Sequence, residues 1–366
     1  MPDAIVRNPD PQALRMDFTF DADQLALRDA IRKLLLIEAA PEMLREIWET
    51  EDGRSQQLRA KFAEQGLTAL SVPEAYGGMA LGDVDWALIQ VELGYFGIPD
   101  SLSDTAYVAA DLLASLPEGQ PLKDEWLPRI AAGEARIAVG HPVQPLVADA
   151  RMADLLLLAH GDELHAVARG GCRLEANPSI DRSRRLFRID WTPDDQTRIC
   201  DAADGAGLWA RCFERGSLAS AGQLLGLAQR MLDLGVDYAA QRKQFGKAIG
   251  TFQAIKHHLA DVAVKIEFAK PVLYRAAHAL ARNDPRAAVS VSHAKLACGD
   301  AAHFAAKRSL QVHGAIGYTW EADLQMFMKR AWALDAAWGG RGRHKARIDA
   351  FVLADGTALG PGTTFG

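Results

Sequence analysis

The sequence predicts a mainly α-helical protein with a small central β domain between two helical regions. Helical periodicity of apolar residues runs from Phe18 to about Ala132 and returns from about Gly205, whereas short apolar runs bounded by Gly, Pro and Asp begin near Gly133. The predicted divisions are a flexible arm (1–16), an N-terminal helical domain (17–132), a reduced β domain (133–204), a C-terminal four-helix bundle (205–353) and a tail (354–366).

The N-terminal region is expected to be helical throughout. In the stretch FTFDADQLALRDAIRKLLL, apolar residues recur every three or four positions and Asp21 can cap the helix. The segment DGRSQQLRAKFAEQGLTAL has the same pattern. A turn cluster, SVPEAYGG at residues 71–78, then precedes two further helical patterns, GDVDWALIQVELGYFG and TAYVAADLLASL.

The central region predicts strands at DLLLLA, ELHAVA and RLFRIDW. It covers only about 60 residues, which is small for an independent sheet domain. The C-terminal region predicts four helices, at residues 217–240, 252–281, 285–314 and 321–338. Pro271 is expected to kink the second of these or to mark a local break, and Gly314 to end the third. The tail is expected to be disordered or to lie along a partner.

Composition excludes several classes of protein. The chain has 366 residues, 49% hydrophobic and 24% charged, with a net charge of -6, which disfavours nucleic acid as a partner. No apolar run approaches the roughly 20 residues that span a bilayer, and the first residues lack a secretion signal. Four cysteines without paired spacing indicate free thiols and a cytoplasmic location. We expect no metal site, since His257 and His258 are adjacent and diverge on a helix.

The stretch QRKQFGKAIGTFQ, residues 241–253, is a candidate binding turn between two helices. Arg242 supplies a cation and, with Lys243, ends the first helix; Gly246 and Gly250 permit a tight reversal; and Thr251 can cap the next helix. A helix start with cations favours a phosphate, and nearby Phe245 and Gln253 suit an attached ring. The alternative is a plain helical hairpin whose cations only offset the helix dipole.

Three motifs resemble the acyl-CoA dehydrogenase family. RKQFGKAIGTFQAIKHHLAD is similar to the family's R-x-x-F-G…F-Q…L-A-D stretch, QVHGAIGY at residues 311–318 to its Q-x-x-G-G-x-G-Y, and VPEAYGG at residues 72–78 to a turn of its N-terminal domain. The helix–sheet–helix layout matches over about residues 17–350. The resemblance implies that both C-terminal motifs reach across a subunit interface to the pyrophosphate and adenine of an FAD held by a neighbour. The implied contacts are Arg242, Phe245, Gln253, Gln311, Gly314 and Gly317. Ala315 departs from the family, which has a second glycine there.

The family's own flavin pocket is missing from this sequence. Family members carry a T-E-P…G-S-D run followed by a strand ending in W-[IL]-[TS], and these groups hold the isoalloxazine ring. The corresponding stretch here, AVGHPVQPLVADARMADLLLLA, contains none of them. A deletion of this kind accounts for the small β region, and it is expected to remove the site for a flavin ring in this chain.

The position of the catalytic base also departs from the family pattern. Most family members have a glutamate near the end of the fourth bundle helix, where this chain has Trp338. Some have it on the first bundle helix, directly before an arginine. Glu214 precedes Arg215 but lies two residues upstream of the family spacing, which turns a helical side chain by roughly 200°. Glu214 is therefore either the base or an acid in the first turn of a helix. Asp335 is a second candidate.

The resemblance leaves several hypotheses for function. The first is a subunit of an α2β2 acyl-CoA dehydrogenase that acts on a bulky, steroid-derived CoA thioester and completes the FAD site of an unlike partner. The second is a self-sufficient homotetrameric acyl-CoA dehydrogenase with Glu214 as base. A non-catalytic scaffold on this fold, or a flavin oxidase or monooxygenase, is also open. For the first two, the family implies an electron-transferring flavoprotein as electron acceptor.

Overall fold

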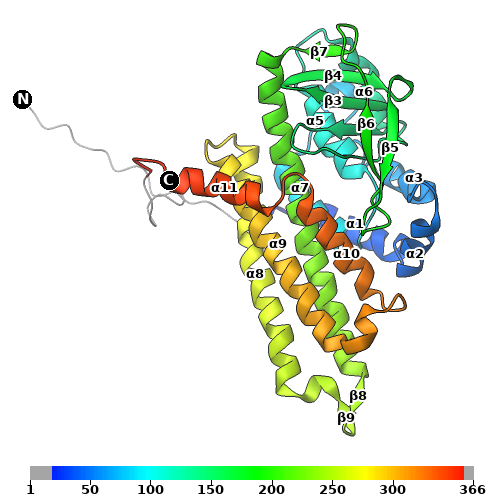
Figure 1. Ribbon diagram of the computed structural model, residues 1–366, viewed down its shortest axis with the longest axis vertical. Helices are drawn as coiled ribbons and strands as arrows, with labels where there is room; N and C mark the ends of the chain where they lie inside the picture. Colours follow the sequence, from blue (N-terminus) through cyan, green and yellow to red (C-terminus); the bar gives the residue numbers. More distant parts are fainter. Residues whose placement is uncertain (1–18, 358–366) are drawn as a thin grey trace, which may run out of the picture.

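A computed structural model describes residues 19–357 and shows two helical regions joined by a small pair of sheets (Figure 1). The predictions for the arm at 1–16, and for most of the tail, lie outside these residues. The N-terminal region consists of α1 (Ala22–Glu38), α2 (Pro41–Glu49), α3 (Gln56–Glu64), the 3₁₀ turn η1 (Glu74–Tyr76), α4 (Asp83–Tyr95), the π-helical η2 (Ser103–Ala109), α5 (Ala110–Ala114) and α6 (Pro121–Ala131).

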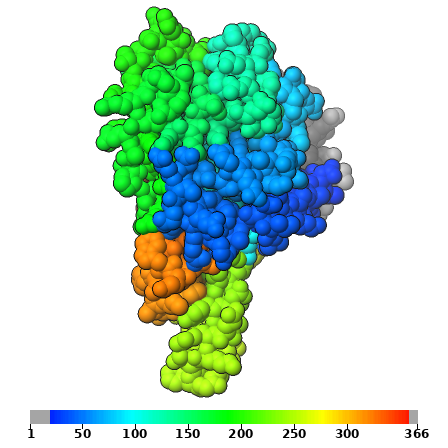
Figure 2. All heavy atoms as spheres, turned by 90° about the vertical axis from the view of Figure 1, so that its right-hand side faces the viewer, coloured from blue at the N-terminus to red at the C-terminus, as the bar shows by residue number. Residues whose placement is uncertain are grey.

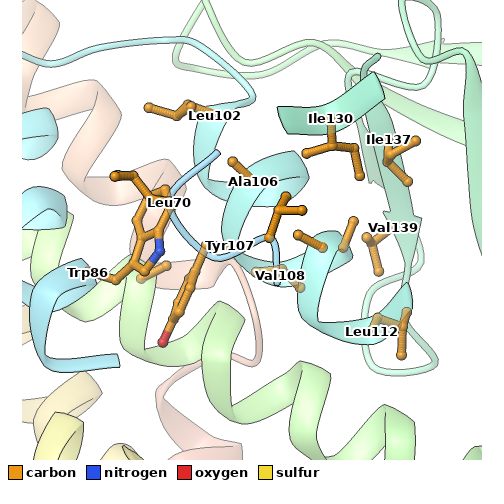
Figure 3. Packing of buried hydrophobic residues seen from close by; sticks show 14 of the residues in the cluster. Leu70, Trp86, Leu102, Ala106, Tyr107, Val108, Leu112, Ile130, Ile137 and Val139 are labelled. Atoms are coloured by element: carbon orange, nitrogen blue, oxygen red, sulfur yellow. The ribbon is translucent and has the colours of Figure 1, made fainter. Parts of the chain in front are cut away.

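The N-terminal helices form where the sequence predicts them. Asp21 caps α1, because its side chain accepts from the backbone N–H of Gln24 and the Gln24 side chain reaches back in a capping box. The core of this region continues into the first sheet. Figure 3 shows Trp86 and Tyr107 stacked, with ring centroids 5.0 Å apart, while Ile137 and Val139 of β1 pack on the same cluster.

The central region contains two small sheets. The first has the strand order β1-β3-β4-β7 and the second β2-β6-β5. The bounds are β1 (Ile137–Gly140), β2 (Val147–Ala148), β3 (Leu155–His160), β4 (Glu163–Ala168), the turn η3 (Arg169–Gly171), β5 (Arg173–Asn177), β6 (Leu186–Asp190) and β7 (Arg198–Cys200). The predicted strands are therefore confirmed as β3, β4 and β6. Only six residues separate β1 from β2, and six separate β2 from β3, so the region stays small.

The C-terminal region is an elongated bundle that ends in a β hairpin at the bottom of Figure 1. Its elements are α7 (Ala202–Gln241), β8 (Lys243–Gln244), β9 (Lys247–Ala248), η4 (Ile249–Thr251), α8 (Gln253–Ala281), α9 (Ala287–His313), η5 (Gly314–Tyr318), α10 (Leu324–Ala336) and α11 (Arg341–Val352). The four predicted helices are present as α7 to α10, and Gly314 ends α9 with φ of 65°.

Three local expectations were wrong. The first bundle helix does not begin at Ser217 but at Ala202, since Asp201 caps it by accepting from the N–H groups of Ala203 and Asp204. Pro271 does not mark a local break, because α8 continues through it; the proline lies on the exposed side, where water can hydrogen-bond to the carbonyl that loses its partner. Thr251 does not cap α8, because its hydroxyl donates to the Ala248 carbonyl 2.7 Å away.

No helix within residues 19–357 is long and apolar enough to cross a membrane.

Candidate functional site

The predicted binding turn is an exposed hairpin at the far end of the bundle. Phe245 and Gly246 form its tip with positive φ, and the Phe245 side chain is 91% exposed. Its ring lies edge-on to Phe252, with centroids 6.1 Å apart, and Lys247 lies over the same Phe252 ring. The tip is therefore held in shape while its outer face stays uncovered.

Arg242 follows the last residue of α7 and is exposed. Its backbone N–H donates to the Tyr238 carbonyl, and its own carbonyl accepts from Ile249, so the backbone is fixed on both sides of the hairpin. Among residues 19–357, none forms a hydrogen bond or ion pair with the guanidinium. Gln253, the first residue of α8, is exposed as well. A guanidinium fixed at its base and without a competing anion is suited to hold a phosphate.

The second motif lies at the same end of the bundle. Tyr238 of α7 stacks on His313 of α9, with ring centroids 4.4 Å apart, which joins the base of the hairpin to Gly314. Gln311 is exposed, and a Cβ on Gly314 would meet nothing within 4 Å. Gly317 is buried against α9, since a Cβ there would lie 2.8 Å from Leu310. Thus the two predicted motifs meet, with Gly317 as a packing position.

The internal cleft between the three regions is filled. Trp338 is 6% exposed and lies against Gly216 of α7. Its backbone N–H donates to Gln144 Oε1 at 2.8 Å, and its backbone carbonyl accepts from the Ser217 hydroxyl and from His344 Nε2. Trp338 has φ of 53°, an unfavourable conformation for a bulky residue, so these contacts must hold it there.

His141 lines the same filled cleft and is neutral. Its Nε2–H donates to the Trp209 carbonyl at 2.9 Å, while Nδ1 accepts from the Val143 N–H. Its ring contacts the rings of Trp209, Phe213 and Trp338. Burial lowers the pKa of His141 to about 4, because the aromatic surroundings disfavour its charged form. His141 therefore packs the cleft and is not a free proton acceptor.

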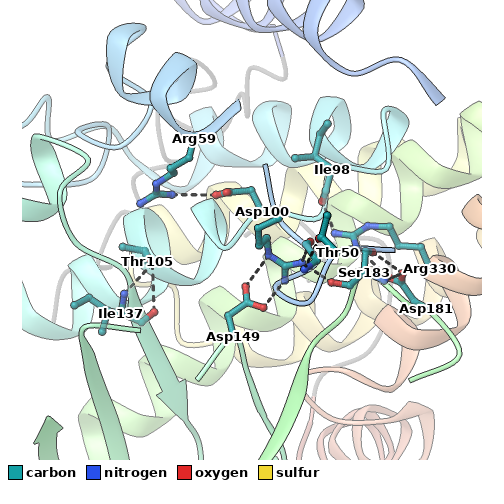
Figure 4. A network of polar contacts seen from close by, with 12 residues as sticks. Thr50, Arg59, Ile98, Asp100, Thr105, Ile137, Asp149, Asp181, Ser183 and Arg330 are labelled. Carbon is teal, nitrogen blue, oxygen red and sulfur yellow. Dashed lines mark hydrogen bonds and ion pairs between the residues drawn. The ribbon is translucent and has the colours of Figure 1, made fainter. Parts of the chain in front are cut away.

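Beside Trp338, a cavity of about 60 Å³ remains, lined by charged side chains. Figure 4 shows the surrounding network, in which Arg59 pairs with Asp100 at 3.0 Å and Arg330 with Asp181 at 3.1 Å, while Asp149 accepts from Arg54. Ligand pockets usually exceed roughly 300 Å³, so this cavity accommodates water molecules and not a flavin ring.

Asp104 also lines this cavity, and its carboxylate has no hydrogen-bond partner within the described residues. Burial raises the pKa of Asp104 to about 6, and the charge of Asp149 acts in the same direction.

Glu214 is tied to another helix. It is 8% exposed, and both of its carboxylate oxygens face the Arg347 guanidinium of α11, one of them at 3.4 Å. Burial raises the pKa of Glu214, although Arg347 acts in the opposite direction. The idea that Glu214 is a first-turn acid is wrong, because α7 begins well before it at Ala202.

Asp335, the other candidate base, is also engaged. It accepts from His303 Nε2 at 3.0 Å, and Lys295 lies nearby. Burial opposes ionisation of Asp335, but the His303 hydrogen bond and the Lys295 charge together hold its pKa below the usual value. A carboxylate held ionised by two partners is a poor proton acceptor.

Sequence reasoning missed the residues that close the cleft. The motif gap at residues 138–159 indicated a lost flavin pocket, but nothing local indicated that His141 and Gln144 would contact Trp338. The only available signal was the replacement of a glutamate by Trp338 at the expected base position.

The fold and the two surface motifs together define a helix–sheet–bundle flavoprotein. The acyl-CoA dehydrogenase N-terminal domain model matches residues 21–134, and the C-terminal domain model matches residues 203–353. The chain belongs to the acyl-CoA dehydrogenase family. Its activity is therefore that of an acyl-CoA dehydrogenase, and its cofactor is FAD.

Three similar proteins illustrate this membership. Acyl-CoA dehydrogenase IpdE2 of Mycolicibacterium smegmatis is 32% identical over 309 residues, 83% of this chain and 91% of its own length. The crystal structure of the ChsE4-ChsE5 complex from Mycobacterium tuberculosis has a TM-score of 0.82 at 23% identity, covering 92% and 99% of the two chains. A structure of the electron transferring flavoprotein of Acidaminococcus fermentans gives 0.83 at 22%, covering 93% and 100%. The last two likenesses show the fold.

The residues of this chain fit the pyrophosphate and adenosine part of FAD but not its isoalloxazine ring. The exposed donors Arg242, Gln253 and Gln311, with the open backbone at Gly314, suit the pyrophosphate and adenosine part. The internal cleft beside Trp338 has no room for the isoalloxazine ring.

Proposed function

We propose that this chain is the cofactor-completing subunit of a heteromeric acyl-CoA dehydrogenase. The observation that carries the proposal is the contrast between its two half-sites. The FAD-contact motifs are uncovered at the end of the bundle, whereas the cleft beside Trp338 is filled. In an α2β2 assembly, the surface motifs would hold the pyrophosphate and adenine of an FAD whose ring lies in the unlike partner.

In this arrangement the residues of this chain bind and orient the cofactor. Arg242 would pair with the pyrophosphate and Phe245 would pack on the dinucleotide. Gln253 and Gln311 would donate or accept hydrogen bonds, and the backbone at Gly314 can approach closely. When bound, FAD supplies hydride acceptance from the β-carbon of the thioester, and the partner supplies the carboxylate that removes the α-proton.

We infer that the partner carries the larger pocket and that the substrate is a CoA thioester with a bulky acyl group, of which steroid-derived thioesters are the candidate class. The ChsE4-ChsE5 structure is a complex of two differently named chains on this fold, which supports an unlike partner. Electrons are expected to pass to an electron-transferring flavoprotein, in keeping with the similarity to the Acidaminococcus fermentans structure.

A self-sufficient homotetramer with Glu214 as base is the second candidate. This candidate is supported by the burial of Glu214 on α7 and by the raised pKa of Glu214. The Arg347 pair counts against it, because both carboxylate oxygens are engaged.

Co-expression separates the two candidates. The chain is produced alone and together with an unlike acyl-CoA dehydrogenase-like subunit from the same source. Flavin absorbance and acyl-CoA-dependent dye reduction are then measured over short-chain, long-chain and steroid-derived thioesters. We expect a colourless, inactive single chain and a yellow, active complex with two FADs per tetramer. A yellow and active single chain would contradict the proposal and favour the homotetramer.

A further inference from the structure

A second surface site lies between the β5–β6 loop and the end of α2, and α10 adjoins it. Figure 2 shows these three segments adjoining on one face, with the β region above, α2 beside it and α10 below. The groove there has a volume of about 450 Å³. Trp48 and Phe187 are among the residues that form its apolar walls, and its polar lining includes Arg182, Arg184 and Arg185.

The groove holds more positive than negative charge. Arg182 pairs with the exposed Glu49 at 2.9 Å. Arg184 donates to the Ala333 carbonyl and Arg185 to the carbonyls of Thr50 and Trp48, and within residues 19–357 neither has a carboxylate partner. The one acid within the loop, Asp181, is committed to Arg330 at 3.1 Å. Neither guanidinium therefore has a carboxylate in direct contact, although Asp181 and Asp149 act on both charges from a longer distance.

An aromatic and cationic surface extends the groove. Trp48 lies edge-on to Trp320, with ring centroids 6.4 Å apart. Lys329 lies 3.5 Å from the centroid of the Trp320 ring, and Arg182 lies over the same ring at 4.9 Å. Burial lowers the pKa of Arg184, Arg185 and Lys329, and in each case a neighbouring arginine acts in the same direction while Asp181 acts against it. A bound anion would favour the charged form of all three groups.

The loop that carries the arginines is ordered before any ligand binds. Asp181 accepts from both the backbone N–H and the hydroxyl of Ser183, and it also pairs with the buried Arg330. Arg54 donates to the Ser183 carbonyl. Because these contacts fix the loop between the β region and α10, little conformational entropy is lost when a ligand binds the arginines.

We propose that this groove binds a phosphate joined to a planar ring, as in a nucleoside monophosphate. The phosphate would lie between Arg182 and Arg185, whose forked donors match its oxygens, and the ring would pack on Trp48 and Phe187. The volume of about 450 Å³ falls within the range of small-molecule pockets. The site is separate from the hairpin motifs, because no residue lining it belongs to β8, β9 or η5.

Calorimetric titration of the full chain with AMP, adenosine and inorganic phosphate tests this proposal. We expect saturable AMP binding in the micromolar to submillimolar range, and binding at least tenfold weaker for adenosine and for phosphate. CoA is titrated as well, because the phosphate and ring could belong to a free nucleotide or to CoA. If AMP binds more tightly than CoA, the ligand is a free nucleotide; if CoA binds more tightly, the ligand is CoA. Absence of AMP binding at millimolar concentration, or equal binding of AMP and adenosine, would overturn the proposal.

Substitutions test whether AMP binds in this groove. Arg182→Gln and Arg185→Gln should each weaken AMP about tenfold or more, while Arg188→Gln should leave it unchanged, since Arg188 is an exposed arginine of β6 outside the groove. Arg182 is exposed, so its substitution keeps the test valid if Arg185→Gln fails to fold. Arg242→Ala should also leave AMP binding intact. Loss of AMP with Arg242→Ala would assign the binding to the FAD motif and overturn the proposal.

Discussion

Trp338 lies so close to Gly216 that a Cβ added to that glycine would sit 2.1 Å from the indole ring. The contact joins the turn after α10 to the middle of α7. Trp338, which stands where the family resemblance implies a catalytic glutamate, therefore closes the cleft.

Gly216→Ala should destabilise the chain by about 3 kcal/mol, because the added methyl must displace Trp338 from a buried, clamped position. Urea unfolding followed by circular dichroism measures the change. Gly207→Ala is the matched control, since Gly207 lies on the same helix and a Cβ there meets nothing within 4 Å. The control should be neutral or stabilising by up to about 1 kcal/mol. Equal effects of both would contradict the packing role.

Glu214→Gln should leave turnover of the complex largely intact while lowering the stability of this chain by about 1–3 kcal/mol, since the amide cannot replace the paired charge facing Arg347. Steady-state kinetics and thermal unfolding measure the two effects. Arg347→Gln removes the other partner and should lower stability in the same way. A loss of kcat of a hundredfold or more in Glu214→Gln alone would instead identify Glu214 as the base.

Arg242→Ala should weaken FAD binding by the complex about 10- to 100-fold, as expected for loss of a charge-assisted hydrogen bond worth about 1.5–3 kcal/mol. Flavin retained after gel filtration and the FAD concentration for half-maximal activity report the change. Arg282→Ala, at the other end of α8, removes an equal charge from an exposed position and should have no effect. Full FAD retention in Arg242→Ala would argue against a cofactor role for the hairpin.

Stability should fall on acidification, in part through His141. Its pKa is about 4 in the folded chain and about 6.5 when unfolded, so between these values the unfolded state binds the extra proton. This term costs up to about 1.4 kcal/mol per pH unit as pH falls from about 6.5 to about 4. His344, with a pKa also of about 4, contributes in the same direction.

Comparison with His141→Gln isolates the His141 contribution. Glutamine keeps a donor and an acceptor but does not titrate, so urea midpoints at pH 7, 6 and 5 should decline less steeply in the variant. The raised pKa of Asp104 acts in the opposite direction below about pH 6, but it is common to both proteins and cancels in the difference. Parallel pH profiles would show that His141 is not buried as a neutral ring.

Arg330→Met should destabilise the chain by about 3–5 kcal/mol, because it leaves Asp181 as a buried charge without its partner. The double variant Arg330→Met with Asp181→Asn removes both charges, and it should recover at least about 1 kcal/mol relative to the single variant. Denaturant unfolding of the three proteins gives the coupling. If the changes in unfolding free energy of the two substitutions simply add, the Arg330–Asp181 pair does not join the β region to α10.

Much of the architecture was predictable because it depends on local pattern. The capping box at Asp21 and the apolar periodicity of α8 and α9 indicated helices at these positions, and the runs at Leu155 and Glu163 indicated strands. Helix boundaries were less accurate. The start of α7 depends on Asp201, and the tolerance of α8 for Pro271 depends on its exposed side, neither of which periodicity reveals.

By itself, the sequence determined the family, the two surface motifs around Arg242 and Gln311, and the absence of the flavin-ring motif, because each is a run of neighbouring residues. Only the tertiary structure decided which side-chain contacts occupy the region where the flavin-ring motif is absent. Arg347 engages Glu214 from 133 positions away, and Asp181 meets Arg330 across 149 positions. A buried charge needs a partner of opposite charge. Because that partner is distant in the sequence, no local pattern specifies it, and the pair forms only when the chain packs.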